Sequence, residues 1–239
     1  LHGVPLAGRP ITAYHDHNAA QARGPLLAAL AAGQSVLYAS DAGTPLVADP
    51  GWRLAQAARE IGAAVHALPG PSAVLTALVL SGLPTDRFAF GGFLPPKAGA
   101  RRRALESWRA VPGTLIFFES ARRAAATLAD VRDVLGAERE AALARELTKA
   151  FEQVRRGTAA ELAEGAAADP PRGEVVLLIG PAPAEGAPDP AALDAALREA
   201  LAAGTLKDAV RTVVERLSAP RKMVYARALE LAEERKDPE

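Results

Sequence analysis

Residues 40–51 read SDAGTPLVADPG, and this stretch follows the short apolar run SVLYA at 35–39. It combines two glycines, two prolines and two aspartates, whereas an ordinary connection needs only one or two residues that break regular structure. Two interpretations are open on these residues alone. The glycines and prolines either shape a surface turn only, or they let the backbone approach a bound ligand closely.

The segments around this loop alternate between apolar runs and helix-like stretches. The runs at 35–39 and 63–68 predict buried strands, while residues 52–61 and 73–82 have helical spacing and are closed by a glycine. Strand, loop and helix repeated twice indicate a parallel sheet with helices on its faces. Ligands bind such sheets at the carboxyl ends of the strands, where we expect the quoted loop and a second dense loop, PGPSA at 69–73.

A second α/β unit with a mixed sheet is predicted from residue 87 onward. Its expected strands lie within 87–96, 113–120, 140–147, 151–157 and 173–180, with a helix at 121–135. Beyond a proline-rich stretch, the tail predicts three short helices, broken at Gly204 and near Pro220, compatible with a helix-turn-helix. The predicted division is a first α/β domain at 1–86, a second at 87–182, a linker at 183–190 and a helical module at 191–239.

Composition narrows the class of protein. The 239 residues are 49% hydrophobic, enough for two domain cores, and they include no cysteine, which excludes disulfides and thiolate metal sites. No apolar run reaches the ~18 residues that a membrane span needs. We therefore expect a cytoplasmic protein without a membrane partner. Because the chain begins at Leu1 and its single methionine is Met223, we also expect a natural segment before residue 1.

Charge is unevenly distributed, although the net charge is zero. From Arg87 to Arg123 there are eight basic residues and two acidic ones, and from Gly204 to Arg227 there are six basic residues and two acidic ones. Segregated positive charge is the pattern that an anionic partner such as nucleic acid uses. For each basic stretch, an ordinary solvated helix surface is the alternative interpretation.

Several familiar catalytic motifs are absent. The sequence has no G-x-G-x-x-G, no phosphate-binding G-x-x-x-x-G-K-[ST], no H-E-x-x-H and no G-x-S-x-G. His15 and His17, in HDHN, are candidate metal ligands, but no cysteine or further histidine lies near them in the sequence. A hydrogen-bonded loop is the favoured interpretation, and no metal site is predicted.

Seven segments in fixed order carry a resemblance to a known family. They are SDAGTPLVADPG, LPGPSA, SGLPTDRF, GFLPPK, TLIFFES, LARELTK and GEVVLLI. Together they resemble the ribosomal RNA small subunit methyltransferase I family, the cytidine 2'-O-methyltransferases of the tetrapyrrole methylase superfamily. The likeness covers residues 10–180, and the tail from 190 is more weakly similar to the helical module of that family. The strand and acidic segment with which the family opens have no counterpart here.

The resemblance implies a fold and a set of ligands. It implies two α/β domains with S-adenosylmethionine in the cleft between them, a homodimer, and 16S rRNA within the small ribosomal subunit as the substrate. The cofactor residues that it implies are Asp41, Ala42, Gly43, Thr44, Ser72, Ala73, Phe118, Leu143, Ala144, Glu174 and Val175. Among these, Asp41 is expected at the end of a buried strand, and Ser72 at a helix start whose free N–H groups suit a carboxylate.

Polar residues elsewhere are candidates for chemistry and for RNA contact. The catalytic candidates Glu119, Arg145, Glu146 and Lys149 end strands that are expected to face the cleft. The substrate candidates are His17, Asn18, Lys97, Arg101, Arg102 and Arg103, with the three arginines expected next to a flexible loop. The alternatives are an exposed strand end for Glu119, an internal ion pair within RELTK (residues 145–149) and solvated helix turns for the arginines.

Two other functions are compatible with the same residues. The first is methylation of a small tetrapyrrole of the precorrin type on the same fold. The second is a non-catalytic RNA-binding assembly factor. The segregated charge and the basic tail favour RNA over a tetrapyrrole, because a porphyrin-like substrate needs neither feature.

Overall fold

The computed structural model describes residues 8–182, 188–217 and 219–234. The chain forms two compact units, Leu1–Pro181 and Ala182–Glu239, which are described separately below. Most of the linker predicted at 183–190 lies outside the described residues. The further division predicted after residue 86 stays a prediction.

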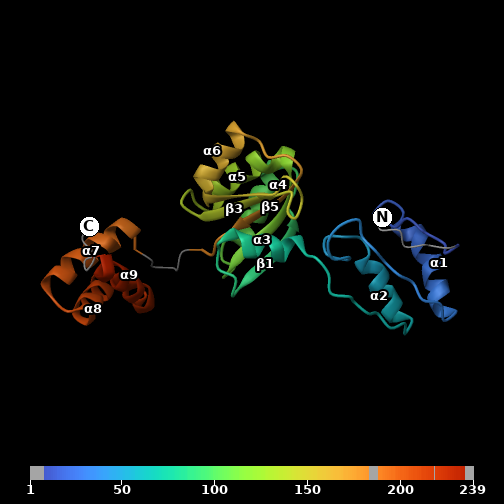
Figure 1. The fold of residues 1–239 in the computed structure, drawn as a ribbon, viewed down its shortest axis with the longest axis horizontal. Helices are drawn as coiled ribbons and strands as arrows, with labels where there is room; N and C mark the ends of the chain where they lie inside the picture. Colours follow the sequence, from blue (N-terminus) through green and yellow to red (C-terminus); the bar gives the residue numbers. More distant parts are fainter. Residues whose placement is uncertain (1–7, 183–187, 218, 235–239) are drawn as a thin grey trace. The chain divides into compact units, whose positions relative to one another are not determined.

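The first unit contains a five-stranded mixed sheet (Figure 1). Its strands run in the order β1-β2-β5-β3-β4, with β1 parallel to β2 and the other neighbours antiparallel. All five overlap the segments in which strands were predicted in this region. Their bounds are β1 Phe88–Phe93, β2 Thr114–Ser120, β3 Glu140–Arg145, β4 Gln153–Thr158 and β5 Glu174–Ile179.

Helices cover both faces of this sheet, because successive strand residues point to opposite sides. On one face, Phe117 and Leu115 of β2 pack with α4 (Ala98–Trp108) and α5 (Ala121–Leu135), and α6 (Ala159–Ala168) completes that layer. On the other face, Ile116 packs with α3 (Ala73–Ser81). The predicted α/β class with layered helices is therefore confirmed.

Local signals account for the ends of α3. Ser72 has extended backbone geometry, and its hydroxyl accepts a hydrogen bond from the Leu75 N–H at 3.4 Å, as an N-cap does. The helix ends at Gly82, whose φ of 78° is left-handed and suits glycine. Arg156 of β4 donates to the carbonyl of Ser81 at 3.1 Å, placing positive charge at the helix C-terminus. These contacts attach α3 to the sheet.

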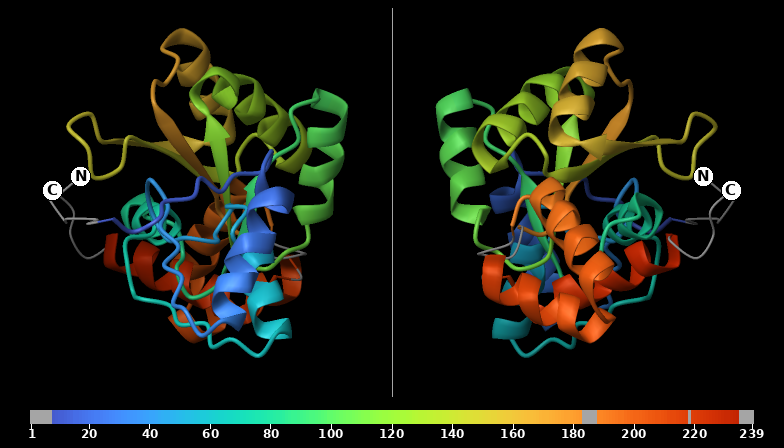
Figure 2. Two further views of the ribbon diagram at one scale, coloured as in Figure 1. Left: turned by 90° about the vertical axis from the view of Figure 1, so that its right-hand side faces the viewer. Right: turned by 90° about the vertical axis from the view of Figure 1, so that its left-hand side faces the viewer.

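The connection between β3 and β4 is a tight turn at residues 146–152. In Figure 2 it is drawn in yellow and extends beyond the body of the sheet. Leu147 in this turn packs against the core on the α3 face, whereas Phe151 is exposed. The turn is therefore anchored on one side and open to solvent on the other.

Two predicted strands do not form in the segment before α3. Residues 35–39 and 63–68 have no strand pairing, and their side chains Leu37 and Leu68 are 86% and 82% exposed. A strand is stable only when its N–H and C=O groups bond to a neighbouring strand, and neither run has one among the described residues. The prediction of a parallel sheet here is wrong for this structure.

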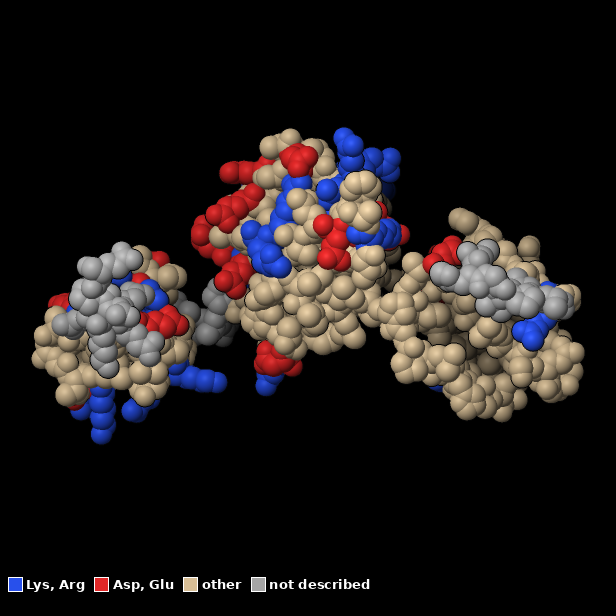
Figure 3. Space-filling model, in the orientation of Figure 1, with Lys and Arg blue, Asp and Glu red and all other residues tan. Residues whose placement is uncertain are grey.

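Helices are present in the same segment. They are α1 (Ala19–Ala31) and α2 (Trp52–Glu60), of which only the second was predicted. On the face drawn in Figure 3, the segment shows mainly uncharged residues. The buried residues of this segment include Leu54 and Ala58 of α2.

The second unit is a three-helix module. Its helices are α7 (Pro190–Ala203), α8 (Leu206–Leu217) and α9 (Arg221–Glu234), as the tail sequence predicted. Leu197, Val210 and Val224, one from each helix, are fully buried together. Arg227 of α9 donates to both carboxylate oxygens of Asp194 in α7, at 2.8 and 2.6 Å. Within the described part of the chain, no helix has the length and hydropathy to cross a membrane.

Candidate functional site

A cleft of about 540 Å³ lies in the first unit. Four stretches line it together with Phe93: the loop 42–49, the start of α3 at 72–74, the end of β2 at 118–121, and the start of β5 at 173–176. Its volume falls within the ~300–1,000 Å³ of typical small-molecule sites. The cleft therefore brings together residues that are as far apart in the sequence as Ala42 and Val176.

The loop at 42–49 is held by side-chain hydrogen bonds. The hydroxyl of Tyr38 donates to Asp49, whose carboxylate also accepts the Gly51 N–H at 2.9 Å. The Thr44 hydroxyl donates to the Pro71 carbonyl at 2.8 Å and so joins the two dense loops. Burial and the hydrogen bond to Asp49 raise the pKa of Tyr38, which keeps its hydroxyl protonated as the donor.

Two glycines in this loop are required by its geometry. Gly43 has a left-handed φ of 70° and lines the cleft. A Cβ at Gly51 would lie 2.6 Å from the ring of Tyr38, so no larger residue fits beside that ring. These residues therefore shape the turn and also lie at a cleft, so the two interpretations do not exclude each other.

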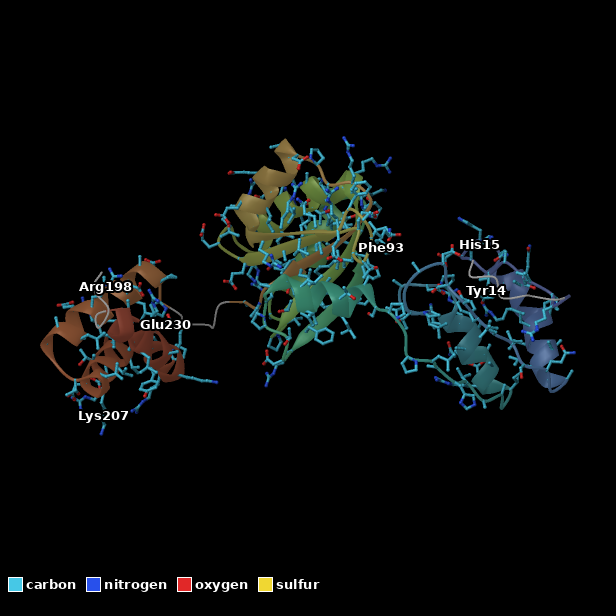
Figure 4. All side chains as sticks on the ribbon, in the orientation of Figure 1. Tyr14, His15, Phe93, Arg198, Lys207 and Glu230 are labelled. Atoms are coloured by element: carbon cyan, nitrogen blue, oxygen red, sulfur yellow. The ribbon has the colours of Figure 1, made fainter. Side chains whose placement is uncertain are left out.

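The start of α3 offers hydrogen-bond donors to the cleft. Ser72 and Ala73 line it, and the first N–H groups of a helix have no partner within the helix. These donors and the positive end of the helix dipole suit a carboxylate or another anion. The wall formed by β2 is aromatic, since the ring of Phe118 lies edge-on to Phe90 at 4.8 Å and to Phe93 at 5.6 Å between centroids. Figure 4 labels Phe93, at the end of β1.

Glu119 lines the cleft, but its carboxylate is bound by groups inside the protein. The side chain has no exposed surface and forms an ion pair with Arg123 at 2.5 Å. The Thr127 hydroxyl and the Ser120 N–H each donate to it at 2.7 Å. The exposed strand end considered as the alternative for Glu119 is thus wrong. The contacts make Glu119 a link between β2 and the first turns of α5.

The residues of RELTK form a network at the rim of the cleft. Glu146 accepts the Glu174 N–H at 2.9 Å and the Lys149 ammonium at 3.0 Å, and Lys149 also pairs with the Glu174 carboxylate at 2.9 Å. The backbone hydrogen bond from Glu174, followed by the one from Lys149, lowers the pKa of Glu146. The two carboxylates raise the pKa of Lys149. Arg145 donates to the Gln153 amide oxygen at 2.9 Å. This is the internal ion pairing that we considered as the alternative for these residues.

The structure brings most of the predicted cofactor residues to the cleft. Those that line it are Ala42, Gly43, Thr44, Ser72, Ala73, Phe118, Glu174 and Val175. Asp41 is exposed and precedes the lining residues by one position, because the strand expected before it does not form. Leu143 and Ala144 do not line the cleft, since β3 lies between β5 and β4 and buries both of them in the core.

Some residues that line the cleft were not predicted. They are Val47, Ala48, Asp49, Val74, Phe93, Ser120, Ala121, Gly173 and Val176. Asp49 lies within the loop at residues 40–51, where an aspartate could have been identified as a candidate site residue. Gly173 has a left-handed φ of 82°, and a Cβ there would lie 2.6 Å from Cγ of Glu146. The sequence around Phe93 did not indicate that this residue lines the cleft, because its position depends on the packing of β1 against β2.

The candidate RNA contacts on α4 divide into two groups. Arg101 is buried and pairs with Asp130 at 2.6 Å, so it is unavailable to a phosphate group and we drop it as an RNA contact. Arg102 pairs with the same carboxylate but stays half-exposed, and Lys97 and Arg103 are exposed. The loop expected before these arginines is shorter than predicted, because α4 begins at Ala98.

His17 and Asn18 lie just before α1. The Asn18 amide oxygen accepts the His15 N–H at 2.8 Å, and its amide nitrogen donates to the Ala13 carbonyl at 2.8 Å. The rings of His15 and His17 are 6.0 Å apart. No group of three or more metal-ligand side chains occurs among the described residues. The hydrogen-bonded loop favoured for this stretch is what the structure contains.

Comparison with known proteins gives two family matches. Residues 5–163 match the family described as tetrapyrrole (corrin/porphyrin) methylases, and residues 187–232 match the family described as the RsmI C-terminal HTH domain. The chain is 50% identical over 224 residues to the ribosomal RNA small subunit methyltransferase I of Mesorhizobium japonicum, covering 93% of this chain and 76% of that protein. It is 46% identical over 172 residues to the protein of the same name from Pseudomonas aeruginosa, covering 71% and 61%.

A solved structure has a similar fold. The crystal structure of the methyltransferase CobJ superposes with a TM-score of 0.50 at 20% identity, covering 68% of this chain and 71% of that one.

Proposed function

This chain belongs to the ribosomal RNA small subunit methyltransferase I family, and from that premise we propose that it methylates the 2'-hydroxyl of a cytidine in 16S rRNA. The methyl donor is S-adenosylmethionine, bound in the cleft described above. The observation that carries this proposal is the assembly of that cleft from two glycine- and proline-rich loops, a helix start and an aromatic strand end. As the resemblance implies, we further propose that the protein acts as a homodimer in the cytoplasm on the small ribosomal subunit.

The residues lining the cleft fit the parts of this donor. The N–H groups at Ser72 and Ala73 suit its carboxylate, and Phe118 gives its adenine an aromatic wall. Gly43 has no side chain to keep a folded ligand away from the backbone. Ala42, Thr44, Glu174 and Val175 complete the proposed contacts. When bound, S-adenosylmethionine supplies a methyl group that a positively charged sulfur already activates.

The remaining task of the protein is to hold the attacking ribose oxygen in line with that methyl group. Orientation of this kind contributes ~7–11 kcal/mol to lowering a barrier. The ribose hydroxyl is a very weak acid, so a cation near its oxygen favours loss of the proton to solvent water. We propose that Lys149 and Arg145, at the rim, serve this role while Glu146 positions Lys149. Glu119 is assigned to supporting this wall, because its carboxylate already has three partners.

Exposed cations support RNA as the substrate. Lys97 directly precedes α4, Arg102 and Arg103 lie on it, and the second unit has Lys207, Arg221 and Lys222. Figure 4 labels Lys207, which extends into solvent. Among the described residues, no carboxylate lies within ion-pair distance of Lys207, Arg221 or Lys222. Unpaired cations of this kind bind RNA phosphates and make the affinity depend on salt.

Methyl transfer to purified small ribosomal subunits tests the proposal. Labelled S-adenosylmethionine is incubated with the protein and with subunits that lack the modification, and the nucleosides are then separated by mass spectrometry. The expected product is 2'-O-methylcytidine, and subunits carrying a 2'-deoxy sugar at the target cytidine should accept no methyl group. Methylation of a base would contradict the 2'-O assignment. Transfer to a precorrin-type tetrapyrrole but not to RNA would establish the alternative substrate.

A further inference from the structure

The turn at residues 146–152 contains several hydrogen bonds of its own. The Lys149 N–H donates to the Glu146 carbonyl at 3.0 Å, and the Glu152 N–H donates to the Lys149 carbonyl at 3.1 Å. The Thr148 N–H donates to the Glu152 carboxylate at 2.7 Å. Leu147 is packed into the core beneath it. The turn is thus an ordered part of the surface.

Two residues of this turn have strained backbone conformations. Glu146 and Thr148 have left-handed φ angles of 48° and 64°. For a β-branched residue such as Thr148 this conformation is a genuine outlier, and such strain persists only where the surroundings over-determine it. Strained residues of this kind cluster at functional sites.

The turn is continuous with the wall of the cleft. Glu146 and Glu174 exchange two hydrogen bonds, the Glu146 N–H to the Glu174 carbonyl at 3.0 Å and the Glu174 N–H to the Glu146 carboxylate at 2.9 Å. Glu174 and its neighbour Gly173 line the cleft. A substrate whose ribose enters the cleft therefore passes beside this turn.

Phe151 is the side chain that this turn presents to solvent. It is 73% exposed, the highest value among the six phenylalanines, whereas Leu147 four residues earlier is packed inward. The charged residues of the turn itself are Glu146, Lys149 and Glu152, and Lys149 is already paired with the carboxylates of Glu146 and Glu174 at 3.0 and 2.9 Å. A local surface with more carboxylates than cations does not attract phosphate, so the aromatic face is its means of contact.

We propose that Phe151 is a stacking platform for an unpaired base of the RNA substrate, next to the nucleotide that enters the cleft. This inference rests on the proposed function for the identity of the substrate. Recognition of RNA by proteins commonly stacks unpaired bases on aromatic side chains. Such a contact is insensitive to salt, unlike contact with phosphate. The net negative surroundings and the aromatic side chain thus point to a base rather than to the RNA backbone.

Two fluorescent probes separate stacking from phosphate contact. One is a short oligocytidylate, and the other is an abasic ribose-phosphate oligomer of the same length, which keeps the phosphates and lacks the bases. Stacking of one base is worth roughly 1–3 kcal/mol, or about 5- to 150-fold in affinity. Phe151→Ala and Phe151→Leu should weaken binding of oligocytidylate by a factor in this range, with binding of the abasic oligomer and the log–log salt slope unchanged. Phe151→Tyr should bind as the unchanged protein does.

Val79→Ala is the matched control, because Val79 is a similarly exposed apolar residue on α3, outside the cleft lining. It should leave both affinities unchanged. Equal oligocytidylate binding by Phe151→Ala and the unchanged protein would overturn the inference, and so would full binding by Phe151→Leu. A loss of self-association in sedimentation of Phe151→Ala, without a loss of oligocytidylate binding, would assign Phe151 to a second copy of the chain instead.

The methyl-transfer assay keeps this inference distinct from the proposed function. If the unchanged protein methylates small subunits and Phe151→Ala does so with the same KM and kcat, only the stacking inference fails. If the unchanged protein transfers no methyl group, the proposed function fails, and the two oligomer probes still report on Phe151.

Discussion

The two walls of the cleft differ in what holds them in place. The sheet wall, at 118–121 and 173–176, continues directly into strands whose residues Phe117 and Leu177 are fully buried. The loop wall, at 42–49 and 72–74, follows segments with exposed apolar side chains and is held by hydrogen bonds of Tyr38 and Thr44. The sheet wall therefore forms together with the hydrophobic core when the protein folds. The loop wall depends on a few polar contacts, so we expect a bound ligand to stabilise it further.

The largest expected contrast is in stability. Phe117→Ala removes a fully buried aromatic side chain beneath the sheet wall and should cost ~3–5 kcal/mol of unfolding free energy. Leu37→Ala, on a mostly exposed side chain near the loop wall, should change it by less than ~0.5 kcal/mol. Urea unfolding followed by circular dichroism measures both. Similar losses for the two variants would remove the contrast between the walls.

Glu119→Gln tests whether the sheet wall needs its buried carboxylate for stability or for chemistry. Hydrogen bonds to a charged group contribute ~1.5–3 kcal/mol, so we expect a loss of unfolding free energy of that size. Cofactor affinity and methyl transfer, measured on the folded fraction, should change little. A variant of normal stability that transfers no methyl group would instead place Glu119 in the reaction. Glu106→Gln is the control, because its ion pair with Arg109 is exposed to solvent and its loss should leave the stability nearly unchanged.

Thr44→Val should act on ligand binding rather than on global stability. It removes the hydrogen bond to the Pro71 carbonyl that joins the two loops and keeps the shape of the side chain. One such bond contributes ~0.5–1.5 kcal/mol, which corresponds to an affinity about two- to tenfold weaker. Calorimetry with S-adenosylhomocysteine measures this directly. An unchanged affinity together with a lowered unfolding free energy would show that the loop wall is part of the core after all.

The smallest expected effect is a difference in pH response. The pKa of Glu146, beside the sheet wall, is lowered from 4.5, so its stabilisation is present above that value and is lost as the pH falls through the lowered pKa. The pKa of Tyr38 in the loop wall is raised from 10.0, so its stabilisation is present below that value and is lost as the pH rises above it.

Hydrogen exchange of the two walls, measured at both ends of this pH range, checks the prediction. Acid should loosen residues 146–152 first, and alkali should loosen residues 42–49 first. Glu146→Gln and Tyr38→Phe should each abolish the response of their own wall and leave the other unaltered. Loosening of both walls at the same pH in the unchanged protein would contradict the assignment.

Much of the fold could be predicted from local patterns. The runs at 113–120 and 173–180 predicted β2 and β5, because strongly apolar stretches of that length are typical of buried strands. The similar runs at 35–39 and 63–68 form no strand, because pairing depends on a neighbour and not on the run itself. The family resemblance drawn from seven motifs is confirmed by the matches over residues 5–163 and 187–232.

The candidate site was predictable only in part. Gly43, Thr44 and Ser72 were identified from the dense loops that contain them, and all three line the cleft. Leu143 and Ala144 were assigned to it by resemblance, yet β3 is an interior strand between β5 and β4 and buries both of them. The position of a strand within the sheet is set by contacts between residues far apart in the sequence, so the order β1-β2-β5-β3-β4 was not available from the motifs.

By itself the sequence determined the places where the chain turns and where its helices end. Ser72 and Gly82 bound α3, and Pro190 begins α7, because a cap, a left-handed glycine and a fixed proline φ act within a few residues. Only the tertiary structure decided which charges are available. Arg101 and Arg102 are neighbours of one type, yet Arg101 is enclosed with Asp130 and Arg102 is half-exposed. The difference arises because burial depends on the face of α4 that packs against α5, which no residue type or local spacing specifies.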